Sequence, residues 1–299
     1  MILKKLLASV VLALVATTGL AKERVISMWP FTPASTQGSY FRAILEQANK
    51  EQDKYDFVFE NKTGAGGAIA TQDIAVVRTG TRILAHSAAY FARPFLYPET
   101  QYNFEQFKPL MVMGFAPAAM ITKGKTLDQI LAQKRINIAT AGAGSSTHLL
   151  AEAFFKQYKE GRDIVMVHYR DSNEAAKDVI GGQADASFEF LGDAKARGDL
   201  ISIVGITGKS RIENFRLLPG MEELVGIFAI YVPKDMPTAQ VNELQNILLR
   251  AEKHESVQML YRRDHNYKDS SMNAPGDLTP WYNRTIKQFE GYTRGIKVN

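Results

Sequence analysis

Short apolar runs, each bounded by turn-forming or polar residues, recur along the chain and have the length of buried β-strands. They lie at residues 24–29, 55–60, 82–85, 136–139, 164–169, 184–188 and 201–206. Segments with apolar residues at helical spacing lie between and after them, at residues 39–49, 68–77, 126–133, 172–181, 238–254 and 279–292. Strands that alternate with helices predict an α/β protein with a parallel sheet and helices on both faces.

Two further apolar stretches predict how the chain is divided into domains. Residues 111–121 are strand-like but interrupted at Pro117, and residues 226–232 end at Pro233. A length of 299 residues allows two medium domains, and no low-complexity linker separates two halves of the chain. We therefore expect that the chain crosses between domains in these two strands.

Residues 136–155 predict a strand, a loop of small residues and a helix in direct succession. Ser145, Ser146 and Thr147 stand where the N-cap of that helix belongs. The first turn of a helix has about four backbone N–H groups without a helical partner, and the helix dipole places partial positive charge there. This helix start is therefore a candidate site for an anion such as a carboxylate. A strand–loop–helix corner also needs small residues for structural reasons, so the segment alone leaves both interpretations open.

The N-terminus has the features of a secretory signal peptide, residues 1–21. Lys4 and Lys5 are basic, residues 6–16 are apolar, and Gly19 and Ala21 are small residues before a cleavage site. The alternative of a membrane anchor is disfavoured, because the apolar run is shorter than the ~20 residues that span a bilayer. We expect cleavage after Ala21 and an exported, soluble mature protein.

Charge and cysteine content narrow the class of protein further. The formal net charge of +5 falls to +3 when Lys4 and Lys5 leave with the signal peptide. The basic residues form no block, so nucleic acid is not an expected partner. The chain has no cysteine, which excludes disulfides and a lipid-attachment cysteine. Together these features indicate the periplasm of a double-membraned bacterium.

Motifs typical of enzymes are incomplete in this sequence. The glycines of residues 61–67 lack the dinucleotide-binding pattern, because Ile69 stands at the third glycine position and no acid lies ~20 residues on. Ser145 or Ser146 with His148 would suggest a hydrolase, but no nucleophile elbow surrounds them. The five histidines have no metal-ligand spacing. We therefore expect a protein that is not an enzyme and that uses no cofactor or metal.

Three loops that follow predicted strands are rich in small and hydroxyl-bearing residues. They lie at residues 31–38, 86–90 and 142–147. In open α/β sheets, ligands bind at the carboxyl ends of the strands. This arrangement favours a binding protein.

Four motifs, in order, carry a resemblance to a known family. They are ENKTGAGG at residues 60–67, GAGSSTHLL at 142–150, HYRDS at 168–172 and GGQAD at 181–185. With the terminal helix after Thr279-Pro280, the chain resembles the Bug (TctC-like) family over nearly its whole mature length. These are the periplasmic solute-binding proteins of tripartite tricarboxylate transporters.

The resemblance implies a two-domain periplasmic-binding-protein fold, a type II-like Venus flytrap. Each lobe would have a mainly parallel sheet, and the ligand cleft would lie between the lobes. Residues 22–122 and 228–299 would form lobe 1, and residues 123–227 lobe 2. Such a monomeric receptor captures a small carboxylate and delivers it to a membrane permease. Alternatively, it presents the ligand to a membrane sensor kinase.

The resemblance also implies which residues hold the ligand, most of them on three loops. These loop residues are Phe31, Thr32, Ser35, Thr36, Ser87, Ala88, Ala89, Ser145, Ser146 and Thr147. Tyr169 matches an aromatic residue of a family motif, and His148 matches a family histidine. Glu189 stands where the family usually has aspartate.

The first loop departs from the family pattern. The family commonly has paired glycines and then an acidic residue, where this chain has Ala34, Ser35 and Gly38. Residues 78–82 are shortened and lack the usual proline-aspartate-glycine. Because these changes touch the wall of the expected pocket, the identity of the ligand does not carry over from the family.

Overall fold

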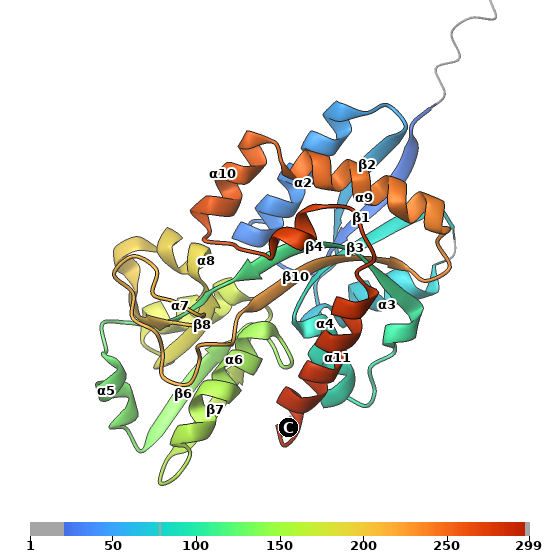
Figure 1. The fold of residues 1–299 in the computed structure, drawn as a ribbon. Coiled ribbons are helices and arrows are strands. Elements are labelled where there is room, and N and C mark those ends of the chain that lie inside the picture. Colours follow the sequence, from blue (N-terminus) through green and yellow to red (C-terminus); the bar gives the residue numbers. More distant parts are fainter. Residues whose placement is uncertain (1–20, 78, 297–299) are drawn as a thin grey trace, which may run out of the picture.

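The computed structural model describes residues 21–77 and 79–296, so the predicted signal peptide lies outside the described residues apart from Ala21. Two five-stranded sheets lie side by side, each with helices on both faces (Figure 1). None of the helices in these ranges combines the length and apolar character needed to cross a membrane.

The two sheets share one plan. The first sheet has the order β2 (Tyr55–Asn61), β1 (Glu23–Trp29), β3 (Thr81–Ser87), β10 (Gly226–Pro233) and β4 (Phe107–Ala116). The second has the order β7 (Asp163–His168), β6 (Arg135–Thr140), β8 (Ala186–Phe190), β5 (Ala118–Thr122) and β9 (Ser202–Ile206). In each sheet one strand, β10 or β5, is antiparallel to both neighbours, and the other four run in one direction. The predicted two-lobe α/β fold with mainly parallel sheets is confirmed.

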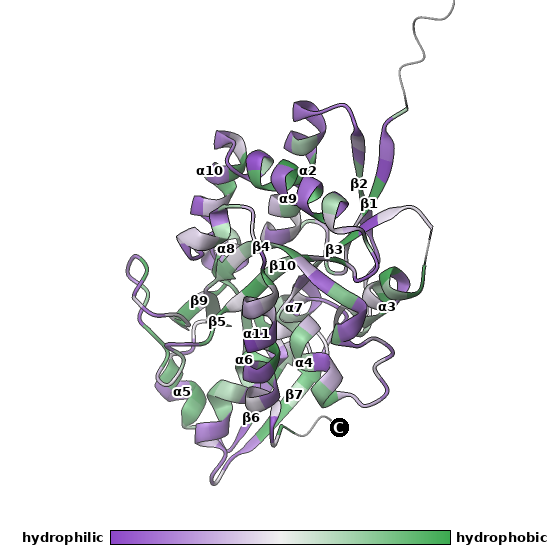
Figure 2. Ribbon diagram, turned by 45° about the vertical axis from the view of Figure 1, so that its right-hand side comes forward, coloured by the Kyte–Doolittle hydropathy of each residue, from purple (hydrophilic) through white to green (hydrophobic). Residues whose placement is uncertain are grey.

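The first lobe has a hydrophobic core on each face of its sheet. Helices α2 (Thr36–Glu51), α9 (Thr238–Glu252) and α10 (Glu255–Arg263) cover one face, and α3 (Ala68–Val76), α4 (Ala89–Leu96) and α11 (Thr279–Thr293) cover the other. Strand β10 shows the alternation: Phe228 and Ile230 join the first cluster, and Ala229 and Tyr231 join the second. Figure 2 shows the apolar strands inside and polar residues along the outer sides of the helices.

The second lobe repeats this arrangement with shorter helices. Helices α5 (Leu127–Leu131) and α6 (Ser146–Phe155) pack on one face, and α7 (Ser172–Gly181) and α8 (Leu191–Ala196) on the other. Single-turn 3₁₀ segments occur in both lobes, at Ala65–Gly67, Phe104–Gln106, Lys156–Tyr158, Gly198–Leu200 and Ser270–Asn273.

The chain passes between the sheets at two neighbouring points. Pro117 separates β4 from β5, and proline has no N–H group with which to continue a ladder. The return segment ends at Gly226, the first residue of β10, which pairs with Ala116. Residues 118–122, expected in lobe 1, pair as β5 with β8 and β9 of the second sheet. We therefore propose Pro117 as the first boundary between the lobes.

Three helices, α4, α8 and α10, were not predicted. The predicted loop at residues 86–90 is wrong, because β3 continues to Ser87 and α4 begins at Ala89. No side chain caps α4, and Pro94 lies inside it, so the sequence has no start signal there. The predicted helix at 238–254 ends at Glu252, and α10 follows directly with His254 as its N-cap.

A buried ion pair ties α9 to the segment after α10. The Glu252 carboxylate accepts hydrogen bonds from the Tyr40 hydroxyl at 2.7 Å and from Lys268 Nζ at 2.5 Å. The side chains of Lys268 and Glu252 are only 4% and 3% exposed. Burial raises the pKa of Glu252 and lowers that of Lys268, so each charge depends on the other.

We predict that Lys268→Met destabilises the protein by roughly 3–5 kcal/mol, because it leaves the Glu252 carboxylate buried without its cation. Urea unfolding of the ligand-free protein measures this. The control is Lys253→Met, which removes the exposed lysine next to Glu252 in the chain and should change stability by about 0.5 kcal/mol or less. Equal effects of the two substitutions would contradict the role given to the pair.

Candidate ligand-binding site

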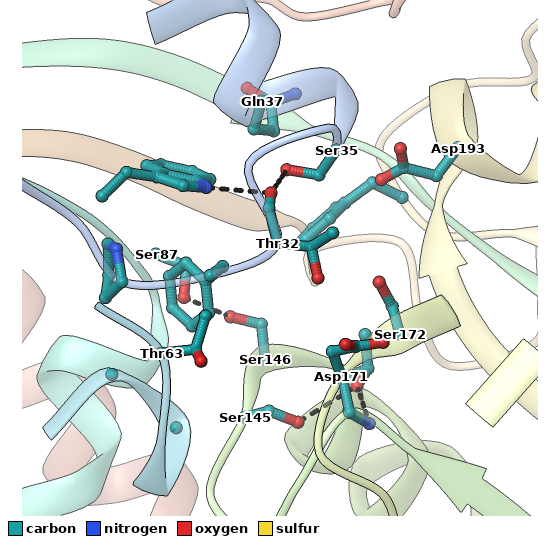
Figure 3. Close-up of a pocket in the computed structure, with 18 of the residues that line it drawn as sticks. Thr32, Ser35, Gln37, Thr63, Ser87, Ser145, Ser146, Asp171, Ser172 and Asp193 are labelled. Atoms are coloured by element: carbon teal, nitrogen blue, oxygen red, sulfur yellow. Dashed lines mark hydrogen bonds between the residues drawn. The ribbon is translucent and has the colours of Figure 1, made fainter. Parts of the chain in front are cut away.

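A cavity of about 80 Å³ lies between the two lobes (Figure 3). Its wall comes from loops at the carboxyl ends of strands in both sheets. The first lobe contributes residues 29–32, Ser35, Gln37, Thr63, the glycines 64, 66 and 67, Ser87 and Phe228. The second contributes Ala141, residues 145–147, residues 170–172, Glu189, Phe190 and Asp193. The cavity is thus shared between lobes, with hydroxyl groups on both sides.

The first loop is held by hydrogen bonds that meet at the carbonyl oxygen of Thr32. Trp29 Nε1 donates to it at 3.1 Å, the Ser35 hydroxyl at 2.8 Å and the Ser35 N–H at 3.1 Å. Ser35 Oγ also accepts from the N–H of Gly38 at 3.1 Å, so it is the N-cap of α2. Phe31 stands edge-on to Trp29 and forms an apolar part of the wall. Ser35 therefore fixes the loop with its hydroxyl.

The start of α6 presents polar groups from the other lobe. Ser145 Oγ accepts from the N–H of His148 at 3.2 Å, which makes Ser145 the N-cap. Thr147 Oγ1 accepts from the N–H of Ala141 at 3.1 Å. The N–H groups of Ser146 and Thr147 belong to the first helical turn, which has no helical carbonyl to bond. Because both residues line the cavity, this turn is the candidate anion-binding end of the cavity.

Ser146 also connects the two lobes. Its hydroxyl donates to Ser87 Oγ of the first lobe at 3.1 Å. Figure 3 shows these two serines facing one another at the edge of the cavity. Nearby, Arg93 Nη1 donates to the carbonyl oxygen of Ala143 at 3.3 Å. The lobes are therefore in contact beside the cavity.

His148 is a structural residue of the α6 loop. Its Nδ1 accepts from the N–H of Gly144 at 3.0 Å, and its ring packs edge-on against His168. Burial lowers its pKa to about 4, so the ring is neutral at pH 7. Among the described residues, neither the Ser145 nor the Ser146 hydroxyl bonds to the ring. The arrangement lacks the nucleophile–base pair that a hydrolase needs.

The glycine-rich loop at residues 63–67 lines the cavity, and sequence reasoning did not include it in the site. Gly64, Ala65, Gly66 and Gly67 all have positive φ, at 130°, 47°, 59° and 93°. A Cβ on Gly67 would lie 2.3 Å from His86 Nε2, so the backbone must pass directly over that ring. The run of glycines directly after a predicted strand was the feature of the sequence from which this part of the cavity wall could have been predicted.

Two acidic residues form another part of the wall. Both oxygens of Glu189 accept from Arg197, at 2.7 and 2.5 Å. Asp193 Oδ1 accepts from the N–H of Thr36 at 2.9 Å, across the gap between the lobes. Burial raises the pKa of Asp193 to about 6, and the Glu189 charge adds to the rise. Asp193 was not predicted, because nothing in the sequence near it suggests a partner 157 residues away.

Eight of the twelve predicted site residues line the cavity: Phe31, Thr32, Ser35, Ser87, Ser145, Ser146, Thr147 and Glu189. The other four do not. Thr36 and Ala89 start helices α2 and α4, and Ala88 lines a neighbouring groove beside α6 and α11, which shares Ser146 with the cavity. The Tyr169 hydroxyl turns away to bond Asp178, and the next three residues, Arg170, Asp171 and Ser172, line the cavity instead.

A model of the tripartite tricarboxylate transporter family receptors, TctC, matches residues 41–268. The chain belongs to this family. Among curated proteins, BugT of Bordetella pertussis is 29% identical over 210 residues, which are 65% of this chain and 64% of BugT. That alignment therefore spans slightly less than two thirds of BugT. The resemblance to the Bug (TctC-like) family is confirmed, and the family is one of periplasmic solute-binding receptors.

Solved structures with the same fold include proteins of Rhodopseudomonas palustris. MatC, solved with bound malate, has a TM-score of 0.80 at 19% identity, covering 90% of this chain and 99% of MatC. A second R. palustris protein, solved with adipate, has a TM-score of 0.79 at 21% identity, covering 91% of this chain and 96% of that one. At these identities the likeness shows the fold, and it confirms the predicted Venus flytrap.

We predict that protonation of two buried histidines, His86 and His148, destabilises the ligand-free protein as the pH falls from 6.5 to about 4, while Asp193, whose pKa is raised to about 6, offsets part of this loss. Burial lowers the pKa of both His86 and His148 to about 4, against about 6.5 in an unfolded chain. The unfolded state therefore binds more protons in this range, and each histidine removes on the order of 1.4 kcal/mol per pH unit. The stability that the neutral rings contribute is present above pH 6.5 and is lost as the pH falls toward 4.

The variant His148→Asn tests the contribution of this residue. Its side-chain oxygen retains an acceptor for the N–H of Gly144 but does not titrate. Urea unfolding at several pH values should give a smaller slope for the variant than for the native protein. Identical slopes would show that His148 does not carry the effect.

Proposed function

We propose that this protein is a periplasmic receptor that captures a small carboxylate between its lobes and delivers it to a tripartite tricarboxylate-type permease. One observation supports this most directly. The start of α6, with Ser145, Ser146 and Thr147, faces the loop of Phe31 and Thr32 across a cavity that both lobes form. A partly positive helix start opposite an apolar wall suits a carboxylate attached to a short carbon skeleton.

The size of the cavity supports a small ligand. One water needs roughly 10–15 Å³ of such volume, so a cavity of about 80 Å³ holds about six water-sized groups. This size favours a small carboxylic acid over a nucleotide. Malate and adipate, bound in the two R. palustris proteins, are of this chemical class.

The donors around the helix start suit a receptor that must release its ligand. Hydroxyl and backbone N–H groups hold a carboxylate without the stronger, harder-to-reverse pairing that a buried cation makes. Closure of the lobes excludes water and strengthens the same bonds. The interlobe contact of Ser146 with Ser87 gives the closed state a contact that an open state lacks. A ligand that favours closure thereby shifts the population that a permease recognises. For this role the protein is exported, with its signal peptide cleaved after Ala21. The role involves no catalysis.

The test is a thermal-shift screen of the mature protein, residues 22–299, against small mono- and dicarboxylates. Ligand binding stabilises the folded state by mass action and thereby raises the melting temperature. At a ligand concentration 100 times Kd, the free energy of unfolding increases by about 2.7 kcal/mol. At least one carboxylate should give a concentration-dependent rise, confirmed by calorimetry. The absence of binding to every small carboxylate would contradict the proposed function.

We predict that Ser146→Leu weakens binding of the identified carboxylate at least tenfold, because its side chain takes the space between α6 and Ser87. The matched control is Ser256→Leu, the same substitution in the first turn of α10 at an exposed position. Calorimetry should show native affinity for Ser256→Leu. Retained affinity in a folded Ser146→Leu protein would exclude the α6 start from the site.

A further inference from the structure

Asp193 is the acidic group of the cavity wall that forms no ion pair among the residues described, although the charge of Arg197 acts on it from a greater distance. Its Oδ1 accepts from the N–H of Thr36, and its Oδ2 has no hydrogen bond there. The Oδ2 atom is not fully buried, so part of its surface is accessible. Asp193 lines the cavity, so a group bound there can approach its carboxylate (Figure 3).

The other charged groups of the wall already have partners. Glu189 is neutralised by the two hydrogen bonds from Arg197. Asp171 caps α7 by accepting from the N–H groups of Asn173 and Glu174. Arg170 pairs with Glu174 at 2.7 Å, and its side chain is 71% exposed. Among the charged groups described in the cavity wall, Asp193 is therefore the one that a charged ligand could pair with.

The surroundings make an unpaired Asp193 costly in the closed protein. Burial, together with the nearby charges of Glu189 and Asp264, raises the pKa of Asp193 to about 6, although the hydrogen bond from Thr36 and the charge of Arg197 act in the opposite direction. A cation next to Oδ2 would offset the lost hydration and form a charge-assisted hydrogen bond. A carboxylate placed there would meet a like charge instead.

We propose that the ligand is an amino acid, with its carboxylate at the α6 start and its ammonium group against Asp193 Oδ2. This inference rests on the proposed carboxylate receptor and specifies the ligand class. Asp193 comes from α8 and Ser146 from α6, so the two poles of the cavity are on different elements of the second lobe (Figure 3). An ammonium group complements the Asp193 carboxylate, and a carboxylate complements the N–H groups at the start of α6. A dicarboxylate satisfies only the α6 end.

The experiment compares amino acids with hydroxy acids of the same skeleton by calorimetry at pH 7.5. The pairs are alanine and lactate, aspartate and malate, and glutamate and 2-hydroxyglutarate, which differ only in an ammonium or a hydroxyl group. In the pair that fits the cavity, the amino acid should bind at least about tenfold tighter, equal to about 1.4 kcal/mol. Equal or tighter binding of the hydroxy acid would overturn the inference and leave the carboxylate receptor intact.

The variant Asp193→Asn tests the residue itself. Its side-chain oxygen still accepts from the N–H of Thr36, so the interlobe bond is kept while the charge is removed. Amino-acid affinity should fall at least tenfold, with hydroxy-acid affinity unchanged or increased. The control, Asp199→Asn at an exposed position of the same lobe, should keep the native preference. A preference that survives in Asp193→Asn would overturn the inference. Failure of the native protein to bind any acid of either series would also overturn it, whereas the proposed function falls only if every carboxylate of the thermal-shift screen fails to bind.

Discussion

The first turn of a helix carries N–H groups that no helical carbonyl can reach, and two such turns face each other here. In α2, Ser35 accepts from Gly38 and Asp193 of the other lobe accepts from Thr36. In α6, Ser145 accepts from His148, and the remaining N–H groups lie at the cavity. Two N–H groups at the start of α2 are thus bonded by protein side chains, whereas those of Ser146 and Thr147 at the start of α6 have no protein acceptor among the described residues. The chemistry of the site follows from this difference.

The shared sheet plan explains why these two turns meet. Strands β1 and β6 occupy the same place in their sheets, second from one edge, and each leads through a loop into α2 or α6. The chain crosses between sheets at Pro117 and returns at Gly226, next to Ala116. These adjacent crossings join the lobes so that the loops after β1 and β6 line one cavity. The topology therefore determines where the candidate site lies, and the side chains that line the cavity determine its polarity.

The sequence allowed the fold and one half of the site to be predicted, because both depend on local signals. Short apolar runs predicted the strands, and a serine before a helical pattern predicted the cap at Ser145, whereas the cap at Ser35 lies in a segment that was predicted as a loop. Asp193 could not be found in this way, since its role arises only when α8 comes against the start of α2. Tyr169 was assigned to the site by motif position. The structure turns its side chain toward Asp178, because α7 follows so closely.

The Thr36–Asp193 hydrogen bond also links closure to electrostatics. The two residues belong to different lobes, so the bond exists only while the lobes are together. Separation returns water to the Asp193 carboxylate, whose pKa burial raises in the closed form. Closure without a ligand therefore costs the hydration of a carboxylate, which one backbone N–H offsets only in part. A ligand that supplies charge complementarity at Asp193 and at the α6 start removes this cost, so the polarity of the cavity favours closure around a ligand over closure of an empty site.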